Sequence, residues 1–229
     1  MIVGSGLLAR AFGPAYSGRP DVCVYAAGVS NSNCDDLHEF RREQQRVEDA
    51  LNQNQHADCF VYFGTCSAYD PEISSSPYVR HKVAMEGMVH AHPRHMVLRL
   101  PQIAGKTPNP HTLLNFLYAR ISRSEAFHIW GGARRNIIDV DDVVSIARQL
   151  IDNVDARNAT VNIANPVNYS MSDIVDAMAG VVGKRAIFDV VNRGSAYSIE
   201  TDAMQPALVR SGVEFDGNYL RRVIAKYYG

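Results

Sequence analysis

Tyr78 and Lys82 lie four residues apart in the segment "SPYVRHK" (residues 76–82), and this pair of residue types can transfer a proton. Side chains four residues apart share one face of a helix, so both can point into the same site. An unperturbed tyrosine has a pKa of about 10. A neighbouring ammonium group favours the phenolate, so we expect Lys82 to lower the pKa of Tyr78 and to make it a usable general acid or base. The spacing by itself also fits two long side chains that merely share a helical face.

The segment "VGSGLLA" (3–9) has the residue types of a phosphate-binding turn. Gly4 and Gly6 follow the apolar run "MIV", and Ala9 stands where a third small residue lets a helix pack closely on a strand. Glycines at a strand–helix turn allow a pyrophosphate to approach the helix N-terminus. A strand–helix turn without any ligand is the alternative. The setting between an apolar run and an amphipathic segment favours the cofactor-binding turn.

Small or hydroxyl-bearing residues end two further strand-like runs. The run "VYAAG" ends in Ala26, Ala27 and Gly28, as expected where a cofactor lies over the backbone, and "FGTCSAY" contains Thr65. The Thr65 hydroxyl can bind a substrate oxygen or, alternatively, the local backbone. Side chains alternate along a strand, so Cys66 is expected to face away from Thr65, and a reactive thiol at Cys66 is the weaker interpretation.

Short apolar runs alternate with helical patterns along the chain, and these elements must position the side chains named above. We expect successive strands and helices at residues 1–3, 7–16, 21–28, 35–54, 58–69, 76–91 and 95–105. Such alternation predicts an α/β fold in which helices cover both faces of a parallel sheet. In an open parallel sheet, ligands bind at the carboxyl ends of the strands, where the candidate residues lie.

The composition is that of an ordinary globular protein. The 229 residues are 46% hydrophobic and 21% charged, and the net charge of −1 argues against a nucleic acid or an anionic membrane as partner. No apolar stretch is long enough to span a membrane, and "MIVGSGLLARAF" lacks the basic start and cleavage site of a signal peptide, so we expect a cytoplasmic protein. The four cysteines show no zinc-binding spacing, and the histidines of "HAHPRH" belong to a helix–strand connection, so no metal site is predicted.

Six segments occur in an order that is typical of one enzyme family. They are "VYAAG", "FVYFGTCSAYD", "SPYVRHK", "VLRLPQIAG", "FHIWGGARRNIIDVDDV" and "VNIANPVNYSMSDI". Together they resemble the extended short-chain dehydrogenases/reductases, in particular the NAD-dependent epimerase/dehydratase family that acts on nucleotide sugars. The resemblance covers nearly the whole chain, and it strengthens the interpretation of Tyr78 and Lys82 as a catalytic pair.

The resemblance implies a fold and an activity. The fold would be a Rossmann-like cofactor domain at residues 1–107, joined by residues 136–166, with a small, intertwined substrate-binding lobe formed mainly by residues 108–229. The activity would be that of an NAD- or NADP-dependent epimerase or keto-reductase acting on a nucleotide-linked sugar.

The resemblance also suggests which residues contact the cofactor and the substrate. Thr65 matches the family's catalytic Ser or Thr, which hydrogen-bonds the reacting oxygen, and Lys82 would also hold the nicotinamide ribose. Arg135 matches an arginine that clamps a nucleotide diphosphate. Further candidate substrate contacts are Gln102, which replaces the family's usual Asn, and Asn109, His111 and Asn115 in the segment that follows.

The chain departs from the family between the first helix and the second strand. Only "SGRP" (17–20) stands there, whereas the family has a further strand, helix and strand that carry the residue reading the adenosine ribose. One parallel crossover alone needs a dozen or more residues, so we expect a sheet truncated on its adenosine side. Weak binding of NAD or NADP, with little discrimination between them, should follow. The strand at residues 1–3 would then lie at a sheet edge, and we expect the C-terminal segment or a second subunit, as in a homodimer, to cover it.

Two further differences limit the possible functions. The sugar 4,6-dehydratases carry an Asp-Glu pair directly after the catalytic Thr, and here Cys66 and Ser67 occupy those places, so we do not expect that activity. The truncated flank also fits a second class of function, a non-catalytic module that binds a nucleotide sugar or a protein with the same fold.

Overall fold

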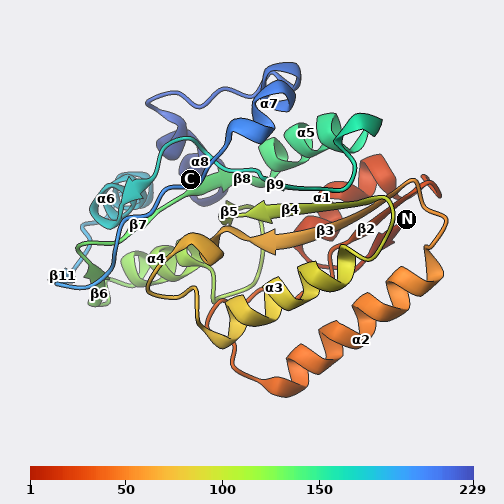
Figure 1. The fold of residues 1–229 in the computed structure, drawn as a ribbon. Helices are drawn as coiled ribbons and strands as arrows, with labels where there is room; N and C mark the ends of the chain where they lie inside the picture. Colours follow the sequence, from red (N-terminus) through yellow and green to blue (C-terminus); the bar gives the residue numbers. More distant parts are fainter.

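The computed structural model, which describes residues 1–229 apart from the side chain of Asp155, is built around a five-stranded parallel sheet. The strands pair in the order β1 (Ile2–Val3), β2 (Val22–Tyr25), β3 (Cys59–Thr65), β4 (His95–Leu100) and β9 (Ala159–Asn162). Each adjacent pair is parallel, so all five carboxyl ends lie at one edge of the sheet (Figure 1). The predicted Rossmann-like α/β fold is confirmed.

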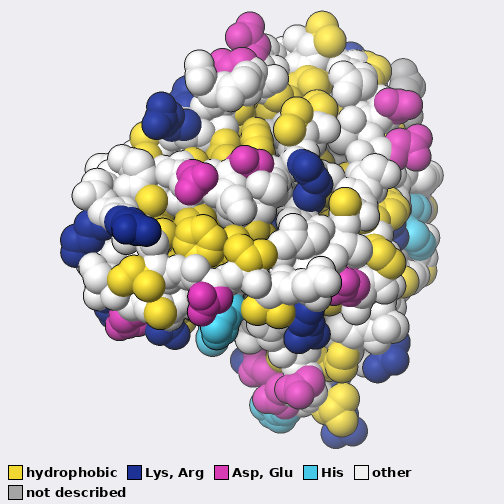
Figure 2. All heavy atoms as spheres, turned by 90° about the vertical axis from the view of Figure 1, so that its left-hand side faces the viewer, with side chains coloured by type: hydrophobic (Ala, Val, Ile, Leu, Met, Phe, Trp, Pro, Cys, Tyr) yellow, Lys and Arg dark blue, Asp and Glu magenta, His cyan; other side chains and the backbone are white. Residues whose placement is uncertain are grey.

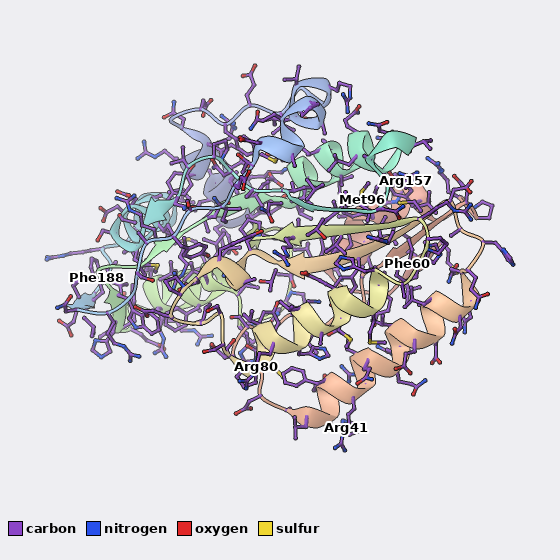
Figure 3. The ribbon with its side chains drawn as sticks, in the orientation of Figure 1. Arg41, Phe60, Arg80, Met96, Arg157 and Phe188 are labelled. Atoms are coloured by element: carbon purple, nitrogen blue, oxygen red, sulfur yellow. The ribbon has the colours of Figure 1, made fainter. Side chains whose placement is uncertain are left out.

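Helices cover both faces of this sheet. The helices α2 (Leu37–Gln53) and α3 (Pro77–Val89) pack on one face, and α1 (Leu7–Tyr16) and α5 (Val140–Ile151) pack on the other. Two fully buried side chains show that each face has its own apolar cluster (Figure 3). Phe60 of β3 joins the cluster of α2 and α3, and Met96 of β4 joins the cluster of α1 and α5 on the opposite face. The sheet is therefore buried on both faces, as its nearly continuous apolar strands require.

A second apolar core lies beyond the carboxyl ends of the strands. Its helices are α4 (Leu113–Ser122), α6 (Met171–Val182) and α8 (Tyr219–Tyr228). Three short strand pairs accompany them: β5 (Gln102–Ala104) with β8 (Ile137–Asp139), β7 (Arg134–Arg135) with β10 (Tyr169–Ser170), and β6 (Phe127–Trp130) with β11 (Phe188–Val191). The remaining helix α7 (Gln205–Ser211) packs on α5, so the C-terminal part of the chain also returns to the core of the sheet. Short 3₁₀ turns occupy Cys66–Tyr69, Val154–Ala156 and Asp202–Met204.

The adenosine side of the sheet is truncated, as predicted. Helix α1 ends at Tyr16, β2 begins at Val22, and β1 has β2 as its strand partner at the edge of the five-stranded sheet. The expectation that the C-terminal segment covers this edge is wrong: α8 packs on α6, β5 and β8, and α7 packs on α5, because their apolar faces complete those two cores. A second subunit at the edge stays a prediction.

Figure 2 shows the face of the molecule toward which the parallel strands point. Lys and Arg side chains, Asp and Glu side chains and exposed hydrophobic side chains all occur there, so this face has no single charge sign. Among the described helices, none is long and apolar enough to cross a membrane. The described His, Cys, Asp and Glu side chains form no cluster that could hold a metal ion.

Candidate active site

The turn between β1 and α1 leaves an uncapped helix N-terminus at the edge of the sheet. Gly4 has φ +127°, and a Cβ there would lie 2.4 Å from the carbonyl oxygen of Ala26, so only glycine allows β1 and β2 to approach so closely. Gly6 precedes α1 without a side-chain cap, and a Cβ at Gly6 would meet no atom within 4 Å. Ala9 is buried against the sheet. The first N–H groups of α1 are thus open to an anion.

Lys82 belongs to α3, and its ammonium lies beside Gly28, just after β2. It forms a buried ion pair with Glu43 of α2. Its Nζ is 3.1 Å from Glu43 Oε1 and 4.4 Å from the centroid of the Tyr62 ring, and the residue is only 4% exposed. A Cβ on Gly28 would lie 2.8 Å from both Lys82 Nζ and Glu43 Oε1. Glycine at residue 28 therefore makes room for this pair directly beside Ala26 and Ala27 of the predicted cofactor site.

Glu43 remains ionised although it is almost completely buried. Burial alone would raise the pKa of its carboxyl group, but bonds from His81, Lys82, the Val29 N–H and Tyr62 outweigh burial and lower the pKa to about 2. Burial lowers the pKa of Lys82, and Glu43 opposes that shift. The two charges stabilise each other in the interior.

Tyr78 and Thr65 lie beside each other at the end of β3, where the Thr65 hydroxyl acts to lower the pKa of the phenol. Ser76 caps α3 by accepting a bond from the Val79 N–H, and Pro77 occupies its first turn, which places Tyr78 one turn before Lys82. Thr65 Oγ1 also accepts a 3.1 Å bond from the Ser67 N–H, so this hydroxyl contacts both the local backbone and Tyr78.

The pKa of Tyr78 shifts in the direction opposite to our expectation. Burial, with a smaller contribution from the charge of Glu43, raises the pKa of Tyr78 to about 12, and the Thr65 hydroxyl opposes this rise. Lys82 cannot act as predicted because its charge is balanced by Glu43. In this structure Tyr78 is therefore a protonated phenol at neutral pH.

The other candidate residues lie around the same strand ends. Asn109 Nδ2 donates a 3.3 Å bond to Ser30 Oγ, which joins the loop after β5 to the loop after β2. Arg135 lies with its NH1 3.6 Å from Asp70 Oδ2, just after β3. Gln102 is half-buried at the start of β5, and His111 is exposed.

Asn115 is engaged within the chain. Its Nδ2 donates to the carbonyl oxygens of Thr107 and Asn109, at 2.9 and 2.8 Å, and its Oδ1 accepts a 2.6 Å bond from Tyr228. These bonds give Asn115 a role in holding the loop that carries Asn109. The Cys66 thiol is fully buried, and burial raises its pKa to about 12, which agrees with the expectation that it is unreactive.

Sequence reasoning missed the charged side chains beneath the site. Glu43 belongs to a long charged helix, yet it lies three residues after Phe40 and four before Val47, both on the buried face of that helix. This spacing is the signal that could have identified it. Glu86, 2% exposed, accepts three bonds from Arg99, and a Cβ on Gly64 would lie 2.2 Å from its Oε1.

Comparison with known proteins gives the family. The sequence profile of the NAD dependent epimerase/dehydratase family matches residues 15–164, more than half of the chain, and the chain therefore belongs to this family. No curated protein matches the chain significantly in sequence.

Solved structures of nucleotide-sugar enzymes have the same fold. RMD from Pseudomonas aeruginosa, complexed with NADPH, is 14% identical over 98% of this chain and 88% of that protein, with a TM-score of 0.70. UDP-glucose 4-epimerase from Thermus thermophilus, in complex with NAD, is 16% identical over 96% and 80%, with a TM-score of 0.72. dTDP-glucose 4,6-dehydratase from Bacillus anthracis, in complex with NAD, is 16% identical over 91% and 72%, with a TM-score of 0.71. At these identities the likeness shows the fold alone.

Proposed function

We propose that this chain is an NAD- or NADP-dependent epimerase or keto-reductase that acts on a nucleotide-linked sugar. The observation that carries the proposal is the placing of the Thr65 hydroxyl beside Tyr78, which lies one helical turn from Lys82, at the carboxyl edge of a parallel sheet. Family membership and the epimerases bound to NAD among the structural neighbours support it.

The chain's own residues supply proton transfer and orientation. A bound nicotinamide dinucleotide would accept or donate the hydride. The hydroxyls of Thr65 and Tyr78 would both bind the reacting oxygen of the sugar, and Tyr78 would give or take its proton. Because the phenol is protonated at neutral pH, it is ready to donate a proton to a carbonyl oxygen, so the free chain is better prepared for reduction of a keto-sugar than for oxidation of a hydroxyl.

One half of a dinucleotide fits the residues present, and the other half does not. The uncapped N-terminus of α1 at Gly6 suits a pyrophosphate, and Lys82 at Gly28 is placed to hold the nicotinamide ribose. The edge position of β1 leaves no further strand to read the adenosine ribose. We therefore propose weak, exchangeable binding with little preference between NAD and NADP.

The substrate would lie between these groups and the second core. Arg135 can bind a diphosphate, and its partner Asp70 orients it. Gln102, Asn109 and His111 are proposed sugar contacts, and Asn115 supports them through the loop rather than by direct contact. Neither Cys66 nor Ser67 supplies the carboxylate that elimination of water needs, which supports an epimerase or reductase over a 4,6-dehydratase.

A non-catalytic binding module is the second candidate. It is favoured by the truncated sheet edge. Such a module would bind a nucleotide sugar without turnover. A cytoplasmic location and a homodimer stay predictions for either candidate.

Turnover assays separate the two candidates. The purified chain is incubated with UDP-, dTDP- and GDP-linked sugars and their 4-keto forms, together with each nicotinamide cofactor, and products are identified by NMR. An enzyme gives a new sugar or a change in nicotinamide absorbance that the Tyr78→Phe variant lacks. Saturable binding of a nucleotide sugar, without turnover by any combination, would instead identify the binding module.

A further inference from the structure

The carboxylate of Glu43 has no part in the chemistry proposed above, yet it is the most completely bonded charged group in the described part of the site. Its Oε1 accepts bonds from Tyr62 at 2.8 Å and from Lys82 at 3.1 Å. Its Oε2 accepts a 2.7 Å bond from the Val29 N–H and lies 3.0 Å from His81 Nε2. The bonds come from the loop after β2, from β3 and from α3, so one side chain of α2 joins three other segments.

These contacts leave Glu43 no capacity to carry a proton. A carboxylate has about four lone-pair positions, and all four are used here. Its low pKa agrees with this, because each donor favours the ionised form. The side chain is therefore a fixed anion and not a proton relay.

The Glu43–Lys82 ion pair lies against Gly28, at the strand end where a cofactor is expected. Glycine at residue 28 is required because a Cβ would come within 2.8 Å of both Glu43 Oε1 and Lys82 Nζ. The end of β2 is where a cofactor would lie over the backbone. The ammonium of Lys82 is thus held at the wall of the predicted cofactor site.

The other polar groups around Lys82 cannot replace Glu43. Three titratable groups act on Lys82 directly: Glu43 of α2 bonds it, the Tyr62 ring of β3 lies beside its ammonium, and the charge of Glu86 of α3 acts on it. His81 of α3 lies against Glu43, and Tyr78 of α3 acts on Tyr62. The tyrosines are neutral phenols because burial raises the pKa of each. The charge of Glu86 is balanced by the two-point ion pair with Arg99. Glu43 is the one anion that bonds Lys82 directly in the described structure.

We propose that Glu43 is a positioning residue that keeps the Lys82 ammonium charged and fixed at the end of β2 before a cofactor binds. This inference deepens the proposed function, on which the role of Lys82 toward a nicotinamide ribose rests. A buried lysine without a counter-charge loses its proton readily, so the anion preserves the group that the cofactor needs.

The titration of Lys82 tests this inference without any substrate. The chain has four lysines (Lys82, Lys106, Lys184 and Lys226), so ¹³C labelling of lysine gives four ε-carbon signals, and Lys82→Met assigns the one of interest. In the wild type we expect Lys82 to be charged at neutral pH. In Glu43→Gln we expect its midpoint to fall by at least about one pH unit, a tenfold change in proton affinity.

The control is the same chemical change on the solvent side of the same helix. Glu48→Gln removes a carboxylate that accepts a bond from Gln44, and it should leave the Lys82 midpoint unchanged. An unchanged midpoint in a folded Glu43→Gln variant would overturn the inference. If that variant does not fold, a wild-type Lys82 that is neutral at pH 7 overturns it equally.

Cofactor binding separates this inference from the proposed function. Where NADH or NADPH binds the wild type, the Glu43→Gln variant should lose its affinity at a lower pH than the wild type, because Lys82 loses its proton at a lower pH in the variant. Equal pH profiles would contradict a positioning role. If neither cofactor binds the wild type but the Lys82 midpoint still shifts, the proposed function fails while Glu43 retains its effect on Lys82.

Discussion

Substituting alanine at Gly28 tests whether the Glu43–Lys82 pair is seated where the structure places it. The added Cβ would lie 2.8 Å from Glu43 Oε1 and Lys82 Nζ and 3.3 Å from Glu43 Cδ. Ordinary contact requires about 3.5 Å, so both partners must retreat by roughly 0.7 Å. Glu43 cannot swing aside, because Val29, Tyr62 and Lys82 all hydrogen-bond to it.

The expected cost of this retreat is that of overpacking a filled interior, about 1–3 kcal/mol of unfolding free energy. For a chain of this size, about 2 kcal/mol lowers Tm by roughly 4–8 °C. Gly18→Ala is the control, because a Cβ there meets no atom within 4 Å and should change stability by less than about 0.5 kcal/mol. Urea unfolding and thermal melting measure both variants. If Gly28→Ala is as stable as the wild type while Gly18→Ala is unchanged, the ion pair is not fixed against the end of β2.

Three other perturbations have defined outcomes. The pKa of Glu43 is lowered from 4.5 to about 2, so its ionisation contributes ~3 kcal/mol to the free energy of unfolding. This contribution is complete above pH 4.5 and is lost as the pH falls toward 2. Urea unfolding at several pH values should show that Glu43→Gln flattens the pH dependence of stability in this range. Tyr78→Phe should lower turnover by ~10² or more with folding little changed, because the ring stays packed; full activity in this variant would remove Tyr78 as acid or base. A thiol reagent should label Cys34 alone in the native protein, because the other three thiols are buried and burial raises the pKa of each; rapid labelling of Cys66 would contradict the structure.

The elements of the sheet could be predicted because their patterns are local. The strand expected at residues 58–69 contains β3, and the helix expected at 35–54 contains α2, since apolar runs and helical periodicity depend on neighbours in sequence. The truncated edge was also predictable, because four residues cannot hold a strand, a helix and a strand.

Contacts between distant segments could not be predicted in this way. The parallel pairing of β6 with β11 joins residues about sixty positions apart, and the residue pattern of neither segment predicts this pairing. The bond between Asn115 and Tyr228 gives a candidate sugar contact a partner within the chain, and it depends on where α8 packs. The wrong direction for the pKa of Tyr78 has the same origin, because the burial that raises this pKa depends on how distant segments pack around the phenol.

Saturable binding of a nicotinamide cofactor tests the central claim most directly. We expect NADH and NADPH to bind with similar and weak affinity, on the order of ~0.1 mM, when their fluorescence is titrated with protein. Gly6→Ala should weaken binding without changing Tm, because its Cβ meets no atom of the chain but enters the space expected for the pyrophosphate. Absence of saturable binding of either cofactor at millimolar concentration would contradict the enzyme and leave the binding module.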